Sequence, residues 1–182
     1  MKPMTLNATT RQDQFDAMLE HSRQAEESVS RWLKTRGCGV IPSYDYNGKD
    51  KEKSPRLSML KDRYVIPDLD VAKEGQRYWI EVKRYTHRPL NKRYGIYVHG
   101  IPERLYRDYL EVQRITGTPV YLAIEDKEYD ALLIAKLDSL TPYPCQCRGC
   151  ANKTGCNATF KGSIKNGVYF DVSEFAVHKS TL

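Results

Sequence analysis

The 182-residue sequence has no long uninterrupted apolar run. No segment approaches the roughly 18 apolar residues of a membrane-spanning helix, and the opening stretch MKPMTLNATTRQDQ has no apolar core of a secretory signal. Internal repeats and low-complexity linkers are also absent. We therefore expect a cytoplasmic protein that folds as one domain over residues 1–182, with a core large enough to be stable without disulfide bonds.

Acidic residues are outnumbered by basic ones. The chain has 29 Lys and Arg residues against 23 Asp and Glu residues, a formal net charge of +6. This balance suits a polyanionic partner such as nucleic acid, but many ordinary basic proteins share it. Charge alone therefore leaves the partner open.

The order of periodic segments predicts an α/β fold with one mixed sheet. A helix is expected from Thr9 or Thr10 to about Arg36, stopped by Gly37. A second helix is expected within 101–117, and residues 47–62 read as a charged loop. The expected strands are 38–46, 64–72, 77–85, 118–126, 130–137 and, as the last, 167–172, with the turn KEGQ joining two of them into a hairpin.

The first predicted helix carries one stripe of residues expected to be buried. Its members recur at spacings of three and four: Phe15, Met18, Leu19, Ser22, Ala25, Glu26, Val29, Trp32 and Leu33. Glu26 lies inside this stripe, and a buried carboxylate requires a partner. Glu27 lies off the stripe, so we expect it in solvent.

Charged residues interrupt the two apolar strands of the predicted hairpin. Side chains alternate along a strand, so Glu81 and Lys83 share a face and lie roughly 7 Å apart. If the preceding strand pairs with this one, Asp68 comes beside Glu81, at a point where Pro67 bends the chain. Two carboxylates so close repel unless a cation lies between them. The alternative, an exposed hairpin with a weak surface ion pair, stays open on spacing alone.

Phosphodiester hydrolysis is the chemistry that needs such a group of side chains. Mg²⁺ takes one or two protein carboxylates and keeps several waters for substrate and nucleophile. A bound metal can polarise the phosphoryl oxygen and lower the pKa of the attacking water. A neighbouring lysine can orient that water or bind the phosphate.

The residues Pro67-Asp68 and Glu81-Val82-Lys83, with a helix-borne glutamate upstream, resemble the PD-(D/E)xK nuclease superfamily over roughly residues 20–125. The resemblance implies a restriction-endonuclease-like αβββαβ core, with a central mixed sheet flanked by helices. It also implies a Mg²⁺ or Mn²⁺ ion held by Asp68, Glu81 and the Val82 carbonyl, with Lys83 serving the water and Glu26 assisting. Asp70 is the second choice as a ligand.

Archaeal Holliday junction resolvases and RecB-like nucleases in this superfamily have a similar plan. The resolvases carry a glycine-serine signature after the first strand, whereas YDYNGKDKEKSPRLS is longer and differently composed. Junction specificity therefore stays open. Tyr109 and Gln113 stand in the reverse order of the RecB-type Gln and Tyr, so that motif is not transferred.

Four cysteines lie close together in an expected insertion at about residues 141–161. Cys145, Cys147, Cys150 and Cys156 form a C-x-C-x2-C-x5-C cluster, and four thiolates can complete a tetrahedral Zn²⁺ shell. The last three also resemble the carboxy-terminal triad of iron-sulfur nucleases, in which a distant cysteine, here Cys38, completes a 4Fe-4S cluster. Zinc is favoured because Cys145 supplies a local fourth ligand.

Basic and aromatic residues follow the candidate lysine closely. They combine phosphate contacts with stacking surfaces, and the candidates are Arg84, Arg88, Lys92, Arg93 and Tyr94. We therefore expect a metal-dependent deoxyribonuclease. A homodimer and an origin in a phage or mobile element are compatible with it. The rival hypothesis is a non-catalytic, zinc-stabilised nucleic-acid-binding module.

The two metal hypotheses give opposite predictions for Cys38. If the four clustered thiolates hold zinc, Cys38→Ser leaves the metal content unchanged and Cys145→Ser releases or weakens the metal. Elemental analysis of anaerobically purified protein checks this. About four iron atoms per chain with matching sulfide, lost in Cys38→Ser, would contradict the zinc assignment.

Overall fold

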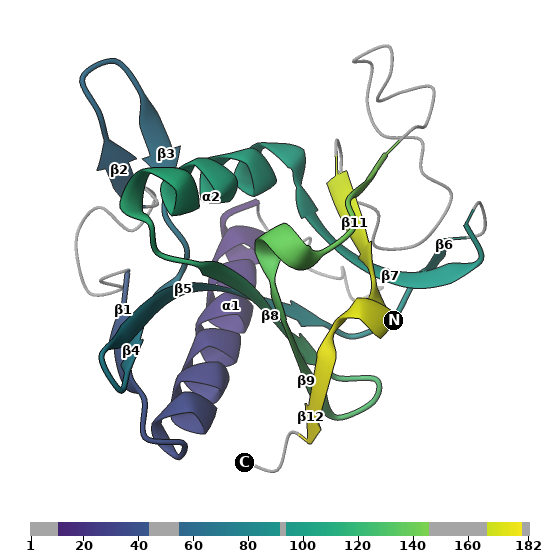
Figure 1. The fold of residues 1–182 in the computed structure, drawn as a ribbon. Helices are drawn as coiled ribbons and strands as arrows, with labels where there is room; N and C mark the ends of the chain where they lie inside the picture. The colour runs from purple at the N-terminus through teal and green to yellow at the C-terminus, as the bar shows by residue number, and fades with distance from the viewer. Residues whose placement is uncertain (1–10, 44–54, 92–93, 146–166, 180–182) are drawn as a thin grey trace, which may run out of the picture.

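The computed structural model describes residues 11–43, 55–91, 94–145 and 167–179 (Figure 1). The elements in chain order are α1 (Arg11–Lys34), β1 (Gly39–Pro42), β2 (Arg56–Ser58), β3 (Arg63–Val65), β4 (Leu69–Lys73), β5 (Gln76–Tyr85), β6 (Leu90–Asn91), β7 (Ile96–Pro102), α2 (Glu103–Thr116), β8 (Val120–Asp126), β9 (Ala131–Lys136), the 3₁₀ turn η1 (Leu137–Ser139), β10 (Tyr143–Pro144), β11 (Gly167–Asp171), the 3₁₀ turn η2 (Val172–Glu174) and β12 (Ala176–Lys179). No described helix is long and apolar enough to cross a membrane.

The central sheet is mixed, as predicted. Its strand order is β1-β4-β5-β8-β9-β12, in which β5 and β8 run parallel and the other neighbours run antiparallel. The elements α1, β1, β4, β5, α2 and β8 occur in the predicted αβββαβ order, with β2 and β3 inserted before β4 and with β6 and β7 inserted before α2. β5 therefore lies inside the sheet, between β4 and β8.

The central sheet is covered on both faces. On one face, Ala25, Val29 and Leu33 of α1 pack against Ile80 and Val82 of β5. The other face is covered by α2 and by a second sheet of order β10-β11-β7-β6 (Figure 1). The buried residues between these layers include Leu122, Leu133, Ile101, Tyr109 and Phe170. β5 thus presents its even-numbered residues to α1 and its odd-numbered residues to the opposite layer.

The predicted hairpin between β4 and β5 is confirmed. Lys73 pairs with Gln76, so the turn has two residues, Glu74 and Gly75, with φ of 51° and 78°. Two left-handed residues match the right-handed twist of the strands. This turn fixes the register that sets Leu69 opposite Ile80.

The predicted strand 64–72 and the loop before it are wrong in detail. β3 ends at Val65 and β4 begins at Leu69, because Pro67 lies between them and proline cannot donate to a sheet ladder. The predicted charged loop 47–62 contains β2, which pairs with β3 in a separate two-stranded hairpin. Three-residue strands are too short to give a clear alternation of apolar and polar residues.

The prediction of one sheet is also wrong. β7 pairs with β6 and β11 in the second sheet, and its sequence IYVHGIP hides a strand because His99 and Gly100 interrupt it. β12 follows β11, the predicted last strand, and pairs with β9 at the edge of the central sheet. Its sequence AVHK is mostly exposed and lacks a strong apolar signal.

The predicted stripe on α1 is buried only in the second half of the helix. Ala25, Glu26, Val29, Trp32 and Leu33 are buried, whereas Met18 is 71% exposed and Ser22 is exposed. Spacing shows which residues share a helix face but not how far a sheet covers that face. Gly37, with φ of 77°, follows the end of the helix as predicted.

Gly100 gives a test of the packing between β7 and β11. A Cβ atom at Gly100 would lie 2.6 Å from Tyr169 Cδ1 and 2.7 Å from the Val168 carbonyl oxygen. Because the carbonyl belongs to the paired strand, Gly100→Ala should lower the free energy of unfolding by about 1–3 kcal/mol. Gly39→Ala is the control, since its Cβ would lie 3.7 Å from Ala72 O. Equal denaturation midpoints for the two variants would contradict this packing.

Candidate active site

Asp68 lies at the break between β3 and β4. Its side chain is 7% exposed, and its Oδ2 accepts a hydrogen bond of 2.8 Å from the Val82 backbone N–H. Leu69 and Ile80 are a register pair, so the next positions along the two strands are Asp68 and Glu81. The structure thus brings these two acidic residues together, as the hairpin predicts.

Glu81 and Lys83 share the face of β5 that points away from α1. Glu81 is 2% exposed, and its Oε1 accepts a hydrogen bond from Lys83 Nζ. The same ammonium lies 3.1 Å from the Val82 carbonyl oxygen. Glu81 Oε2 is buried, and it has no hydrogen-bond partner among the described residues.

Glu26 approaches the same site from α1. It is 7% exposed, and its negative charge contributes to raising the pKa of Asp68. The buried position agrees with the stripe read from the sequence. Glu27, one residue later, is exposed and lies 3.4 Å from Arg23 on the solvent side of the helix.

Burial and the neighbouring charges shift the pKa values of this cluster in opposing directions. Burial raises the pKa of Asp68 well above its usual range, and the charges of Glu81 and Glu26 raise it further, against the lowering effect of Lys83. For Lys83, burial lowers the pKa, but the charges of Glu81 and Asp68 outweigh burial and raise it overall. Three carboxylates thus lie near one ammonium group, and a cation beside the carboxylates would lower the pKa of Asp68.

The donor set fits a hard divalent cation. No group of three or more His, Cys, Asp or Glu side chains is arranged as a metal site within the described residues. However, Mg²⁺ usually takes only one or two protein carboxylates and keeps several waters. Asp68, Glu81 and the Val82 carbonyl offer oxygen atoms only. The buried Oε2 of Glu81 lacks a donor, and a cation would satisfy it.

Asp70, the second-choice ligand, is engaged elsewhere. Both of its carboxylate oxygens accept hydrogen bonds from Arg77, and Nε of Arg77 lies 2.7 Å from Oδ1. Arg77 is largely exposed, and its guanidinium lies 5.4 Å from the centroid of the Trp79 ring. In this structure Asp70 therefore belongs to an ion pair at the start of the hairpin.

Arg84 forms a buried ion pair with Glu125 of β8, which the sequence reading missed. Glu125 is 3% exposed and also accepts from Lys127 at 2.6 Å and from Ser28 at 3.1 Å. Gln24 of α1 accepts from Arg84 at 3.1 Å. This network fastens α1 to β5 and β8 beside Glu26. A carboxylate at the end of the apolar strand VYLAIED was the available signal.

Arg88 forms a second buried ion pair, with Asp126. Asp126 is fully buried and accepts from Arg88 Nε, while its Oδ2 lies 3.4 Å from His99 Nε2. The His99 ring stacks on Tyr85, with centroids 4.5 Å apart, and burial lowers the pKa of His99. These contacts give Arg88 and His99 a structural role. Whether Arg84 or Arg88 also contacts nucleic acid stays a prediction.

The remaining predicted residues are only partly within the described chain. Lys92, Arg93, Cys147, Cys150 and Cys156 lie outside it. Tyr94 is 37% exposed, and its ring centroid is 5.1 Å from that of Tyr143. Cys145 is half-buried, and Cys38 is buried with its Sγ 3.4 Å from the Tyr78 hydroxyl. The metal at the cysteine cluster therefore stays a prediction.

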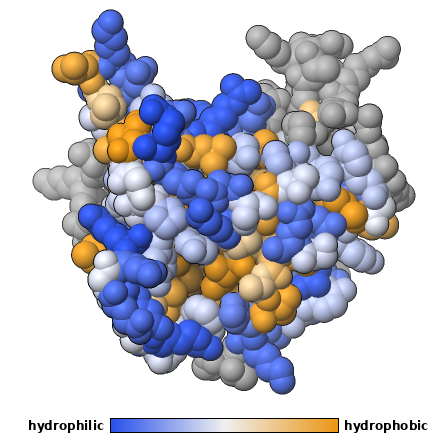
Figure 2. All heavy atoms as spheres, in the orientation of Figure 1, coloured by the Kyte–Doolittle hydropathy of each residue, from blue (hydrophilic) through white to orange (hydrophobic). Residues whose placement is uncertain are grey.

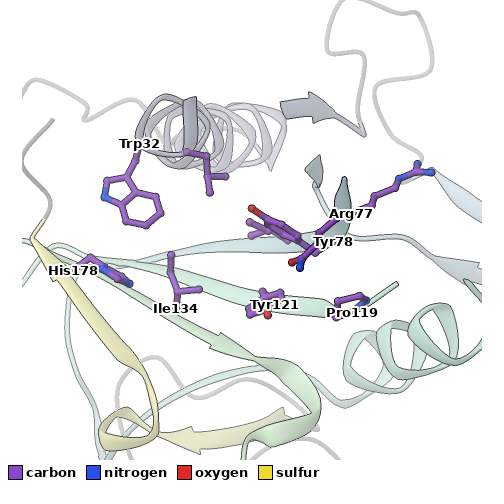
Figure 3. Close-up of a pocket in the computed structure, with 10 residues that line it drawn as sticks. Trp32, Arg77, Tyr78, Pro119, Tyr121, Ile134 and His178 are labelled. Atoms are coloured by element: carbon purple, nitrogen blue, oxygen red, sulfur yellow. The ribbon is translucent and has the colours of Figure 1, made fainter. Parts of the chain in front are cut away.

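An aromatic groove of about 570 Å³ lies between α1 and the central sheet (Figure 3). Its walls include Trp32, Tyr78, Tyr121, Ile134 and His178. None of its ten lining residues belongs to the predicted site. The groove is thus lined by none of the residues of the carboxylate cluster.

No protein-family model matches the chain, and no curated protein sequence matches it. Among solved structures, Hjc, a Holliday junction resolvase from Archaeoglobus fulgidus, is similar with a TM-score of 0.50 and 12% identity, over 84% of this chain and 90% of the resolvase. The chain shares the resolvase fold. D212, a nuclease from a fusselovirus, aligns with 93% of this chain and 89% of its own at 12% identity, with a TM-score of 0.37. The predicted likeness to archaeal resolvases is confirmed for the fold.

The Arg84–Glu125 pair gives a stability test with a defined pH dependence. Burial raises the pKa of Glu125, but its bonds to Lys127 and Arg84 outweigh burial and lower it below its ordinary value. The ionised carboxylate therefore stabilises the fold fully at pH values above the ordinary pKa of a glutamate. This stabilisation is lost as the pH falls through the lowered pKa of the folded state. Glu125→Gln also leaves Arg84 buried without its partner, so it should cost about 3–5 kcal/mol at pH 7.

Glu103→Gln is the matched control, because the Glu103–Arg107 pair is exposed and should contribute less than about 1 kcal/mol. Urea denaturation at several pH values measures both. The difference in free energy of unfolding between wild type and Glu125→Gln should decrease at acid pH. A difference in free energy of unfolding that is small at pH 7, or that increases on acidification, would contradict the assigned ion pair.

Proposed function

We propose that this chain is a metal-dependent nuclease that hydrolyses phosphodiester bonds of DNA. The observation that carries the proposal is the cluster of three buried carboxylates, Glu26, Asp68 and Glu81, with the half-buried Lys83 beside them. Burying three like charges in one place costs the fold stability unless a cation or a substrate needs them. The shared fold with a Holliday junction resolvase supports the proposal, and so does the excess of basic residues.

Each residue of the cluster has a proposed role. Asp68, Glu81 and the Val82 carbonyl hold Mg²⁺ or Mn²⁺, and Asp68 is oriented for this by the Val82 N–H. The metal, when bound, supplies charge to polarise the phosphoryl oxygen and acidify the attacking water. Lys83 positions that water or the phosphate through its ammonium group. Glu26 would assist the metal site from α1.

DNA is proposed as the substrate because of the resolvase likeness and the net charge. The predicted contacts are Arg84, Arg88, Lys92, Arg93 and Tyr94, among which Arg84 and Arg88 already bind buried carboxylates. Phosphate contacts by those two would add to their structural role. Whether the substrate is single-stranded, duplex or branched is the first question for a cleavage assay.

The cysteine cluster is proposed to hold a structural Zn²⁺ through Cys145, Cys147, Cys150 and Cys156. A 4Fe-4S cluster using Cys38 is the alternative. Cys38 packs on Tyr78 at the α1 face of the sheet, and its thiol is buried. Zinc is favoured because Cys145 supplies a local fourth ligand, so that no distant cysteine is required.

Changes at the metal ligands test the proposal directly. Asp68→Ala and Glu81→Ala should each reduce cleavage of DNA by more than about 100-fold. In metalloenzymes, mutating a residue that only hydrogen-bonds to a metal ligand already costs about 10–100-fold in metal affinity or activity, and a ligand itself should cost more. Lys83→Ala should lose about 10²–10⁴-fold in rate with little loss of metal affinity, because an ammonium is not a ligand. Cleavage is measured on single-stranded, duplex and branched DNA with Mg²⁺, Mn²⁺ or EDTA.

Glu26→Gln and its neighbour Glu27→Gln form a matched pair on α1. Glu26→Gln should lower activity about 10–100-fold with little change in melting temperature, and Glu27→Gln should change neither. A non-catalytic binding module would bind DNA equally well in every variant and cleave it in none, wild type included. That outcome would overturn the nuclease proposal.

A further inference from the structure

The β2–β3 hairpin projects from the molecule with apolar side chains at its tip. Arg56 pairs with Val65 and Ser58 pairs with Arg63, and the Met59 N–H donates to Asp62 O across the turn. Leu60 at the tip is fully exposed, at 105%, and Met59 is 50% exposed. Figure 1 shows the turn of the hairpin extending beyond the other elements, and Figure 2 shows apolar and hydrophilic atoms side by side near the end of this projection.

The base of this hairpin is anchored to the rest of the fold by core packing and hydrogen bonds. Val65 is 5% exposed within the core on the α2 side of the sheet. Its N–H donates to Asp108 Oδ2 of α2 at 3.2 Å, and the Ile66 N–H donates to the Pro55 carbonyl at 3.2 Å. The supported stem holds the apolar tip in water, where it is available to a binding partner.

The charge of the hairpin indicates a polyanion as that partner. Within residues 55–65 the basic residues are Arg56, Lys61 and Arg63, and the acidic residue is Asp62. All four side chains are exposed. Basic residues beside an exposed Met-Leu pair are the chemistry of proteins that contact phosphates and insert an apolar wedge between bases.

The hairpin is also joined directly to the candidate active site. Leu60 precedes Asp68 by eight residues, and eight residues span at most about 28 Å. At 3.4 Å per step, this corresponds to about eight base pairs. A wedge at the tip would therefore enter bound DNA within about eight base pairs of the cleaved bond.

We propose that Met59 and Leu60 insert between bases of DNA bound at the Asp68–Glu81 site and unstack one base step there. The proposal rests on DNA binding at the proposed active site, but it does not require cleavage. Unstacking costs least where bases are already unpaired, so the wedge favours branched, mismatched or single-stranded regions over uniform duplex. DNA with branched, mismatched or single-stranded regions is therefore the substrate class of the proposed nuclease.

The test uses the full chain in EDTA, so that no DNA is cut. A series of duplexes carries the fluorescent base 2-aminopurine at successive positions, beside a branched DNA labelled in the same way. Wild type should raise the 2-aminopurine fluorescence at one or two neighbouring positions. The double variant Met59→Ser with Leu60→Ser should lose this signal and bind about tenfold more weakly, because two apolar side chains no longer leave water. Both positions are exposed, so folding should be unchanged.

Val177→Ser is the control, since Val177 is 65% exposed on β12 at the far edge of the central sheet. It should behave as wild type. The wedge is overturned if bound wild type raises no fluorescence, or if the double serine variant raises it equally. It is also overturned if the double variant changes only the sedimentation coefficient, which would make the tip a contact between two copies of the chain.

The outcomes separate the wedge from the nuclease. Unstacking in EDTA without cleavage in Mg²⁺ or Mn²⁺ supports the wedge and overturns the nuclease proposal. Cleavage without unstacking supports the nuclease and overturns the wedge. Absence of DNA binding by wild type overturns both.

Discussion

The hydrogen bond from the Val82 N–H to Asp68 ties together the residues on which the candidate site depends. It joins the break after β3 to the middle of β5, and so it places an aspartate against Glu81 inside the protein. Two carboxylates in that position repel, and a third, Glu26, adds to the repulsion. A fold that retains all three carries a cost in stability, and one lysine offsets only part of it.

The surroundings of β5 hold this arrangement in place from both faces. On the α1 face, Arg84 binds Glu125 and fixes the helix that carries Glu26. On the opposite face, Tyr85 stacks on His99 and its hydroxyl donates to the Gly100 carbonyl of β7, in the second sheet. The strand that carries Glu81 and Lys83 is therefore anchored at its carboxyl end in two layers. Such support is what a site needs to keep carboxylates at fixed positions.

Much of the fold and of the site geometry could be read from the sequence. The Glu74-Gly75 turn fixes a register, and alternation then puts Glu81 and Lys83 on one face and brings Asp68 beside them. Glu26 could be found because a charge within an apolar stripe is unusual. These inferences worked because they depend on residues close in sequence or on one hairpin.

The parts that the sequence did not reveal depend on pairing between distant segments. β7 is interrupted by His99 and Gly100, which make sense only once Tyr85 and β11 are packed on them. From the sequence alone, Glu125 is only a polar residue at the end of a strand. Its role follows from the ion pair with Arg84, which lies 41 residues earlier in the chain. The β2–β3 hairpin was hidden in a charged stretch because its strands have three residues each. Periodicity does not report such long-range contacts.

The most direct test of the site is the position of a bound metal. A crystal of the full chain soaked in Mn²⁺ and measured at the manganese absorption edge should show an anomalous peak within about 2.5 Å of carboxylate oxygens of Asp68 and Glu81 and of the Val82 carbonyl. Lys83 Nζ should then have moved away from Glu81. A crystal that takes up manganese only elsewhere, with Lys83 still bound to Glu81, would contradict the assignment of this cluster as a metal-dependent active site.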